Sequence, residues 1–318
     1  MDITKIADFE FANTFGQAAR PYDVALFASG FEMRARHIAE QVNAEFAEEV
    51  YCLGFQDERA KDAVRLENDR VISSIAGRSV ISARADDADV VYRLLNDSLR
   101  GKKRPRLFID YTSMSKQWYA AVLCWSKYNG LDIDGLSIDF MYSVGEHSRN
   151  RKGLVIRDLY SMPGCTGTVA VGKRNAVAIG LGFDSAAARV VLERLQSDEV
   201  LAFYARPGAV AGDDDAVEEF NKELLAASGV LRLPLPLRSV ERAYRSLTQL
   251  VATTRSDCQV IIAPMGPKPL VLASLLTAHA FDDVACLRVS THQNEPENVT
   301  AAGEIVGVRV QIERTPIV

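Results

Sequence analysis

Short apolar runs alternate with amphipathic stretches along most of the chain, and this alternation constrains the fold more than any other feature. Val24–Ala28 is the first apolar run, and residues 32–46 form the first stretch with helical spacing. Each strand-and-helix step takes roughly 20–30 residues, which is typical of a parallel sheet flanked by helices. The sequence therefore predicts an α/β fold with mostly parallel sheets.

The alternation runs twice, and the two rounds match at an offset of 152 residues. Gly30-Phe31-Glu32 falls on Gly182-Phe183-Asp184, and Lys116 falls on Lys268. A stretch rich in small residues, Pro and Gly (161–168) separates the rounds. We therefore expect two tandem Rossmann-like domains, residues 1–165 and 166–318, related by an internal duplication.

Composition narrows the functional classes. The 318 residues carry a net charge of -5, which disfavours a non-specific nucleic-acid binder. No apolar run approaches the ~20 residues of a membrane helix, and the first residues lack a signal-peptide pattern, so we expect a cytoplasmic protein that makes no contact with a membrane. Five dispersed cysteines and four scattered histidines show no ligand spacing, so we predict neither a metal nor a cofactor.

Ligands of parallel sheets bind beyond the carboxyl ends of the strands, which directs attention to the turn after the first strand. This turn reads Ser29-Gly30-Phe31-Glu32, with Arg34 and Arg36 just beyond. Gly30 permits a tight turn, Glu32 could bind a ribose hydroxyl, and Arg34 could bind a phosphate. Alternatively, Glu32 only favours a helix dipole and the arginines are solvated. The single glycine does not make a G-x-G-x-x-G dinucleotide motif.

The turn after the fourth strand is the densest polar cluster of the chain. Its candidate ligand-binding residues are Asp110, Thr112, Ser113, Ser115 and Lys116. Hydroxyls, backbone N–H groups at a helix start and a lysine together predict an anion-binding turn, although Ser113 or Ser115 could serve only as a helix cap. The turn has neither the Walker pattern nor G-x-S-x-G, which disfavours a P-loop NTPase and a serine hydrolase.

The matching turns of the second round retain less of this chemistry. Their candidate ligand-binding residues are Gly182, Asp184, Met265, Gly266 and Lys268. The lysine is retained while alanines replace the arginines, which suggests one asymmetric site at the junction of the two halves.

A tandem pair of Rossmann-like units with anion-friendly turns after strands one and four resembles the CARF and SAVED sensor domains of bacterial antiphage systems. The resemblance rests on residues 29–32 and 110–116 and on their echoes at 182–184 and 264–268. It implies a cyclic oligonucleotide ligand lying across two such units. Such sensors are generally fused to an effector, and this sequence has neither the R-x-x-x-x-H ribonuclease motif nor a transmembrane segment. The resemblance therefore implies a separate effector protein, or loss of the effector function.

The leading hypothesis is a protein that senses a nucleotide-type phosphorylated ligand, with or without homodimer formation. The alternative is an enzyme that cleaves or transfers glycosidic or phosphodiester bonds of nucleotides or sugar phosphates. Its candidate catalytic residues are Glu32 and Asp110 as nucleophile or general base, with Lys116 as charge stabiliser. A third reading is a structural partner in an assembly that binds no ligand.

Overall fold

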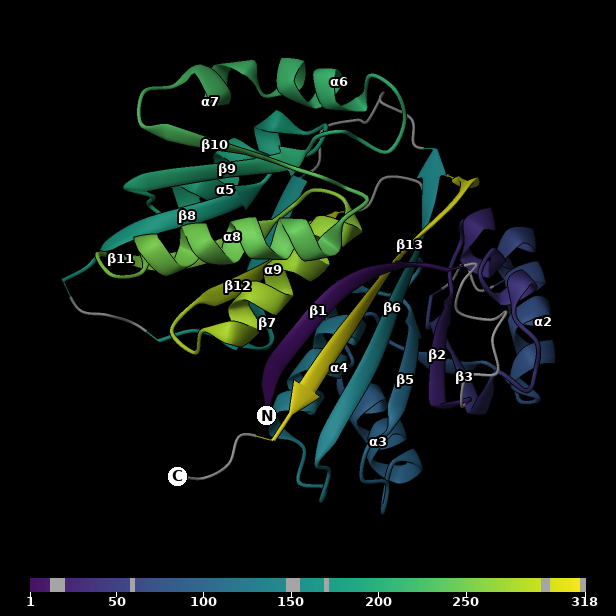
Figure 1. Ribbon diagram of the computed structural model, residues 1–318. Helices are drawn as coiled ribbons and strands as arrows, with labels where there is room; N and C mark the ends of the chain where they lie inside the picture. The colour runs from purple at the N-terminus through teal and green to yellow at the C-terminus, as the bar shows by residue number, and fades with distance from the viewer. Residues whose placement is uncertain (12–20, 58–60, 147–154, 169–171, 293–297, 315–318) are drawn as a thin grey trace. The chain divides into compact units, whose positions relative to one another are not determined.

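The computed structural model describes residues 1–11, 21–57, 61–146, 155–168, 172–292 and 298–314. The chain forms two compact units. Unit 1 comprises residues 1–146 and 296–318, and unit 2 comprises residues 147–295. Each unit is a sheet of mostly parallel strands flanked by helices, which confirms the predicted α/β class (Figure 1).

Within its described residues, unit 1 holds a seven-stranded sheet in the order β1-β13-β6-β5-β2-β3-β4. The strands are β1 (Asp2–Glu10), β2 (Tyr22–Ser29), β3 (Ala47–Phe55), β4 (Ile81–Ala83), β5 (Arg106–Asp110), β6 (Gly135–Glu146) and β13 (Thr300–Glu313). The helices are the 3-10 turns η1 (Met33–Arg36) and η2 (Ala39–Gln41) and the α-helices α2 (Ala63–Ala76), α3 (Asp89–Ser98) and α4 (Lys116–Tyr128).

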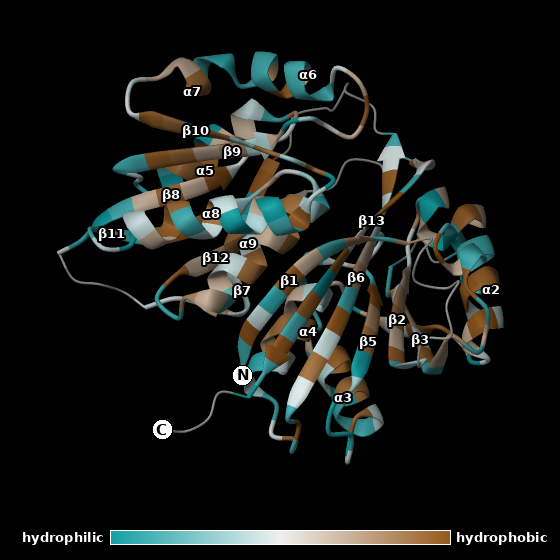
Figure 2. Ribbon diagram, viewed as in Figure 1, coloured by the Kyte–Doolittle hydropathy of each residue, from teal (hydrophilic) through white to brown (hydrophobic). Residues whose placement is uncertain are grey.

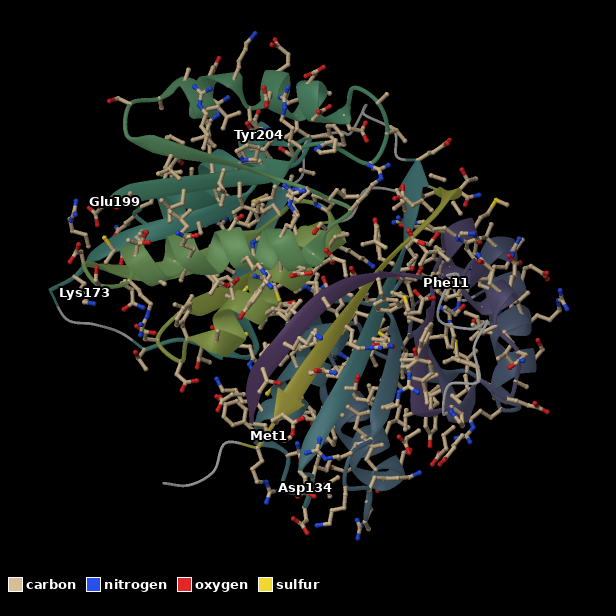
Figure 3. The ribbon with its side chains drawn as sticks, in the orientation of Figure 1. Met1, Phe11, Asp134, Lys173, Glu199 and Tyr204 are labelled. Atoms are coloured by element: carbon tan, nitrogen blue, oxygen red, sulfur yellow. The ribbon has the colours of Figure 1, made fainter. Side chains whose placement is uncertain are left out.

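Unit 2 has a six-stranded sheet, again within its described residues, in the order β10-β9-β8-β11-β12-β7. The strands are β7 (Val155–Thr166), β8 (Arg174–Gly180), β9 (Glu199–Ala205), β10 (Val230–Leu235), β11 (Cys258–Pro264) and β12 (Ala285–His292). The helices are α5 (Ser185–Arg194), α6 (Asp213–Phe220), α7 (Lys222–Ala226), α8 (Val240–Thr254) and α9 (Lys268–Ala280). In Figure 3, Lys173 and Glu199 mark the amino ends of β8 and β9, and Tyr204 lies toward the carboxyl end of β9.

The parallel strands of both units follow one order. If the parallel strands of each unit are numbered along the chain, the sheets read 3-2-1-4-5, with antiparallel strands added beside the fifth. This is the Rossmann order, in which the first and fourth strands are neighbours at the point where the direction of winding reverses. The shared order is what a duplication predicts; common ancestry itself stays a prediction.

Apolar side chains on both faces of the central strands account for this arrangement. All eight residues of β2 are buried. Ala25 and Phe27 pack into a core with Ile72 of α2, and because side chains alternate along a strand, Val24 and Leu26 face the opposite side of the sheet. In unit 2, α9 is buried nearly all round, and Figure 2 shows it in the hydrophobic colour of the strands. Runs that are apolar on every side are expected where helices cover both faces of a parallel sheet.

The domain boundary differs from the one predicted at residues 165 and 166. That position lies at the end of β7, which pairs antiparallel with β12 inside unit 2. The predicted linker, 161–168, is therefore largely a strand. The last strand, β13, belongs to unit 1, because it pairs with β6 on one side and β1 on the other. Hydrogen bonds between strands far apart in the sequence place β7 in unit 2 and β13 in unit 1, and local composition carries no information about such pairings.

The helix predicted over residues 32–46 is also wrong. The segment forms only η1 and η2. The backbone N–H of Met33 donates to Asn298 Oδ1 at 3.1 Å, and that of Arg34 donates to the Val299 carbonyl at 3.2 Å. Residues 298 and 299, just before β13, thus bind the backbone N–H groups of Met33 and Arg34. The chain there forms short 3-10 turns instead of a regular helix.

The described part of the chain contains no helix that is both long and apolar enough to cross a membrane. All five cysteines are free; four are buried and Cys124 is half-buried. Burial raises the pKa of the Cys52 thiol to about 12.

Candidate functional site

The turns that follow β2 and β5 touch each other at the carboxyl edge of the unit 1 sheet. A Cβ atom placed on Gly30 would lie 2.9 Å from both Cβ and Oγ of Ser113. Gly30 is absent from the glycines with positive φ, so the position requires glycine for space rather than for backbone conformation. The structure therefore brings together Ser29, Gly30 and Ser113 at the switch point of the sheet.

The polar side chains of the turn after β5 are largely engaged with the protein itself. Asp110 Oδ1 accepts a hydrogen bond from the Thr112 N–H at 3.0 Å, and Thr112 Oγ1 accepts one from the Ser143 N–H at 2.9 Å. Ser115 is the N-cap of α4, and its Oγ accepts a hydrogen bond from the backbone N–H of Trp118 at 3.2 Å. For Ser115 the capping interpretation is therefore confirmed. Lys116 is half-buried in the first turn of the same helix.

Arg34 points into unit 1 and binds it closely. Its Nε donates to Glu32 Oε2 at 2.6 Å, and its Nη1 donates to the Tyr142 hydroxyl at 2.8 Å and to the Ser143 carbonyl at 3.1 Å. Burial disfavours the guanidinium charge, but Tyr142 and Glu32 outweigh it and raise the pKa of Arg34 above its ordinary value. Arg34 therefore fixes the turn after β2 to β6. Neither sequence interpretation of Arg34, a phosphate ligand or a solvated cation, describes this buried contact.

Ser143 of β6, which the sequence places at a strand end of the same predicted rim, makes contacts that the sequence does not predict. Its carbonyl accepts from Arg34, its N–H donates to Thr112, and its Oγ lies 2.8 Å from Nδ1 of His37. Nε2 of His37 lies 2.9 Å from Nε2 of Gln41. Burial lowers the pKa of His37. Ser143 thus connects the two candidate turns, and since its partners lie 31 to 109 positions away, no local pattern predicts these contacts.

An asparagine that follows the second parallel strand binds the first turn in each unit: Asn68 on α2, and Asn221 between α6 and α7. The buried Nδ2 of Asn68 donates to the carbonyls of Gly30 and Glu32, both at 3.0 Å. In unit 2, Nδ2 of Asn221 donates to the carbonyl of Gly182 at 2.8 Å. Asn68 thus binds two carbonyls of its turn, whereas Asn221 binds one and uses the same amide for the Val217 carbonyl; neither asparagine was predicted from the sequence.

Three aromatic rings line the turn after β2. Phe55 stacks on Trp118 with ring centroids 4.8 Å apart and planes at 19°, and Phe31 stacks on Phe55 at 6.1 Å and 24°. The Arg65 guanidinium lies 5.7 Å from the Phe31 ring centroid. An aromatic wall therefore borders the place where Gly30 meets Ser113, since the Phe55 ring is 3.9 Å from the Gly30 Cβ position.

Some buried polar atoms in this region have no hydrogen-bond partner among the described residues. They are Oγ of Ser29, Oγ of Ser113 and Nε1 of Trp118, together with Oε1 of Gln117. Buried polar groups nearly always have partners, and leaving one unpaired costs about 1–3 kcal/mol. Several such atoms around one turn are therefore a feature that needs a physical explanation.

The predicted residues of unit 2 come together in a similar way. Met265 donates its N–H to the Gly180 carbonyl at 3.0 Å, and a Cβ on Gly266 would lie 2.8 Å from the Leu181 carbonyl oxygen. Gly182 approaches the same turn, its Cβ position being 3.7 Å from the Met265 carbonyl oxygen. Asp184 caps α5 by accepting from the Ala187 N–H at 2.9 Å, and Lys268 begins α9. The turns after β8 and β11 thus meet, without the hydroxyls of unit 1.

Acidic residues of the described chain form no group that could hold a metal ion. The Asp213–Asp215 run begins α6. Asp213 Oδ2 accepts from the Val210 N–H at 3.0 Å, and Arg206 lies within ion-pair distance of Asp214 and Asp215.

No model of a protein family and no curated protein matches this sequence. Among solved structures, the chain is similar to the cytoplasmic domain of a prokaryotic cation chloride cotransporter. The identity is 9%, the match covers 90% of this chain and 97% of that chain, and the TM-score is 0.26. A likeness at this TM-score supports no conclusion about function.

Proposed function

We propose that unit 1 binds a nucleotide-type phosphorylated ligand at the turns after β2 and β5. One observation carries the proposal: the buried hydroxyls of Ser29 and Ser113, at the switch point of the sheet, have no hydrogen-bond partner in the described part of the chain. Ligands of this fold class bind at that point, and hydroxyls beside a helix N-terminus suit a phosphate group.

The surroundings support an anion. The first turn of α4, which starts at Lys116 directly after these hydroxyls, presents backbone N–H groups and the positive end of the helix dipole. Lys116 adds a positive charge at the same helix end. Thr112 Oγ1 accepts a hydrogen bond from the Ser143 backbone N–H, and the Ser115 hydroxyl, which accepts one from the Trp118 backbone N–H, is also able to donate.

The remaining parts of a nucleotide would meet the neighbouring side chains. Glu32, whose side chain is 29% exposed, is able to accept a bond from a ribose hydroxyl beside its ion pair with Arg34. The resemblance to antiphage sensors extends the proposal to a cyclic oligonucleotide, and to a separate effector protein acting in the cytoplasm.

The geometry gives the enzymatic alternative less support. A nucleophile or general base needs its carboxylate available for reaction. Glu32 is ion-paired with Arg34, and Asp110 Oδ1 accepts the hydrogen bond of the Thr112 N–H, so both carboxylates already hold the protein's own turns in place. A binding protein needs neither group to react.

The test has two stages. Mass spectrometry of small molecules released from the purified, denatured protein identifies candidates, and calorimetry with nucleotides, including cyclic di- to tetranucleotides, measures binding. Lys116→Ala should weaken binding about tenfold, since a charge-assisted hydrogen bond contributes roughly 1.5–3 kcal/mol.

Lys127→Ala is the matched control. Lys127 lies in the last turn of the same helix, about 16 Å from Lys116 at 1.5 Å per residue, so its loss should leave the affinity unchanged. Equal affinities of the Lys116→Ala variant and the wild-type protein would refute the assignment of the site.

A further inference from the structure

The two tryptophans of the chain differ in one respect. Nε1 of Trp125 donates to Asn96 Oδ1 at 2.9 Å. Trp118 is fully buried, yet its Nε1 has no acceptor among the described residues. A buried indole N–H usually has a partner, so this position stands out.

Trp118 Nε1 is one of three buried hydrogen-bond donors of the two candidate turns and α4 that have no partner among the described residues, and we call these three the donor cluster: Ser29 Oγ, Ser113 Oγ and Trp118 Nε1. Ser29 precedes Gly30, Ser113 Oγ lies 2.9 Å from the Gly30 Cβ position, and the Phe55 ring that stacks on Trp118 lies 3.9 Å from it. Gln117 Oε1 is unpartnered as well, but consecutive helix residues do not face each other, so it belongs to another side of α4.

The chemistry of the donor cluster limits what can occupy it. An indole N–H can only donate, and a hydroxyl can both donate and accept. No hydrogen bond joins the Asp110 carboxylate to these three atoms, and its Oδ1 accepts from the Thr112 N–H instead. The occupant must therefore present acceptor oxygens to up to three donors, which suits a phosphoryl group better than it suits a hydroxyl or an amine.

We propose that the Trp118 indole N–H donates a hydrogen bond to a phosphoryl oxygen of the bound ligand, which makes Trp118 a ligand-contacting residue of unit 1. The inference rests on the proposed function and names the part of the ligand that the buried donors recognise. The aromatic wall contributes by holding the indole ring in place, since Trp118 stacks on Phe55.

The indole signals in a ¹⁵N-tryptophan NMR spectrum test this directly. The full chain has two tryptophans, so two indole N–H signals are expected, and Trp125→Phe assigns them. Titration with inorganic phosphate, pyrophosphate and adenosine monophosphate should move the Trp118 signal downfield in a saturable way. The Trp125 signal should stay in place, because its donor is already bound to Asn96.

Calorimetry on the same samples separates the two proposals. If one of the probes binds and the Trp118 signal does not move, the indole contact is refuted while the proposed function stands. If none binds and no signal moves, both are refuted. A Trp118 proton that exchanges with solvent and ignores every probe marks a buried water as its partner, which also overturns the inference.

Trp118→Phe gives an independent measurement. The phenyl ring retains stacking on Phe55 and lacks only the donor, so phosphate affinity should fall roughly tenfold, equivalent to about 1.4 kcal/mol. Trp125→Phe should leave the affinity unchanged. If Trp118→Phe does not fold, the titration of the wild-type protein still decides.

Discussion

Gly30→Ala tests whether the turns after β2 and β5 meet as described. The new methyl carbon would lie 2.9 Å from Cβ and Oγ of Ser113, so these atoms must move by about 0.5 Å to reach an ordinary contact distance of 3.4 Å. The backbone at Gly30 has no positive φ, so a side chain adds no conformational strain of its own. The change in stability therefore reports the contact between the new methyl group and Ser113.

The expected cost is that of overpacking, about 1–3 kcal/mol. Urea unfolding followed by tryptophan fluorescence is a suitable assay, because Trp118 and Trp125 both lie in unit 1. With a urea dependence of about 2 kcal/mol per M, a loss of 2 kcal/mol lowers the midpoint by about 1 M. Ligand binding should be lost as well, because the methyl group occupies the place where the donor cluster meets its ligand.

Two further variants make the measurement specific. Gly130→Ala is the control, since a Cβ there meets no atom within 4 Å, and it should leave the midpoint unchanged. Ser113→Gly removes both clashing atoms, so the double variant Gly30→Ala, Ser113→Gly should be more stable than the sum of the single effects by about 1–2 kcal/mol. A midpoint of Gly30→Ala equal to that of the wild type, or strictly additive effects, would refute the contact.

The remaining predictions concern Arg34 and His37. Arg34→Met removes a buried guanidinium with partners on two segments and should lower the free energy of unfolding in urea by about 2–4 kcal/mol. The control Arg70→Met, at an exposed ion pair, should not shift the urea midpoint. Equal midpoints for Arg34→Met and the wild type would contradict a positioning role for Arg34. Because the pKa of His37 is lowered in the folded state, its contribution to stability is complete above the unfolded value of 6.5 and is lost as the pH falls through the folded pKa. Unfolding at pH 7.5 and pH 5 should show a weaker pH dependence for His37→Gln than for the wild type, and an identical dependence would exclude His37 as its source.

Most of the fold followed from local patterns. The local pattern predicts a strand over 106–110 and a helix over 115–128. The structure has that strand, and its helix starts one residue later with Ser115 as the N-cap. The helix over 32–46 failed because hydrogen bonds from residues 298 and 299, far along the chain, hold its first residues. Both β1 and β7 were missed, since β1 has a single fully buried residue, Ile6, and polar residues interrupt β7.

The candidate site shows the same division. Sequence placed Gly30, Asp110, Thr112, Ser113 and Ser115 at strand ends, where the α/β rule directs attention. It could not show that Ser113 meets Gly30, or that Ser143 and Asn68 join the turns to their surroundings.

The sequence by itself determined the α/β class, the double round of strands and helices, and the two turns at the carboxyl edge, because these depend on periodicity and on residues next to one another. Only the tertiary structure decided where the units divide, that Arg34 points inward, and that Trp118, Ser29 and Ser113 hold buried polar atoms with no partner among the residues described. These depend on pairing and burial between segments tens to hundreds of residues apart, and local preference carries no information about such contacts.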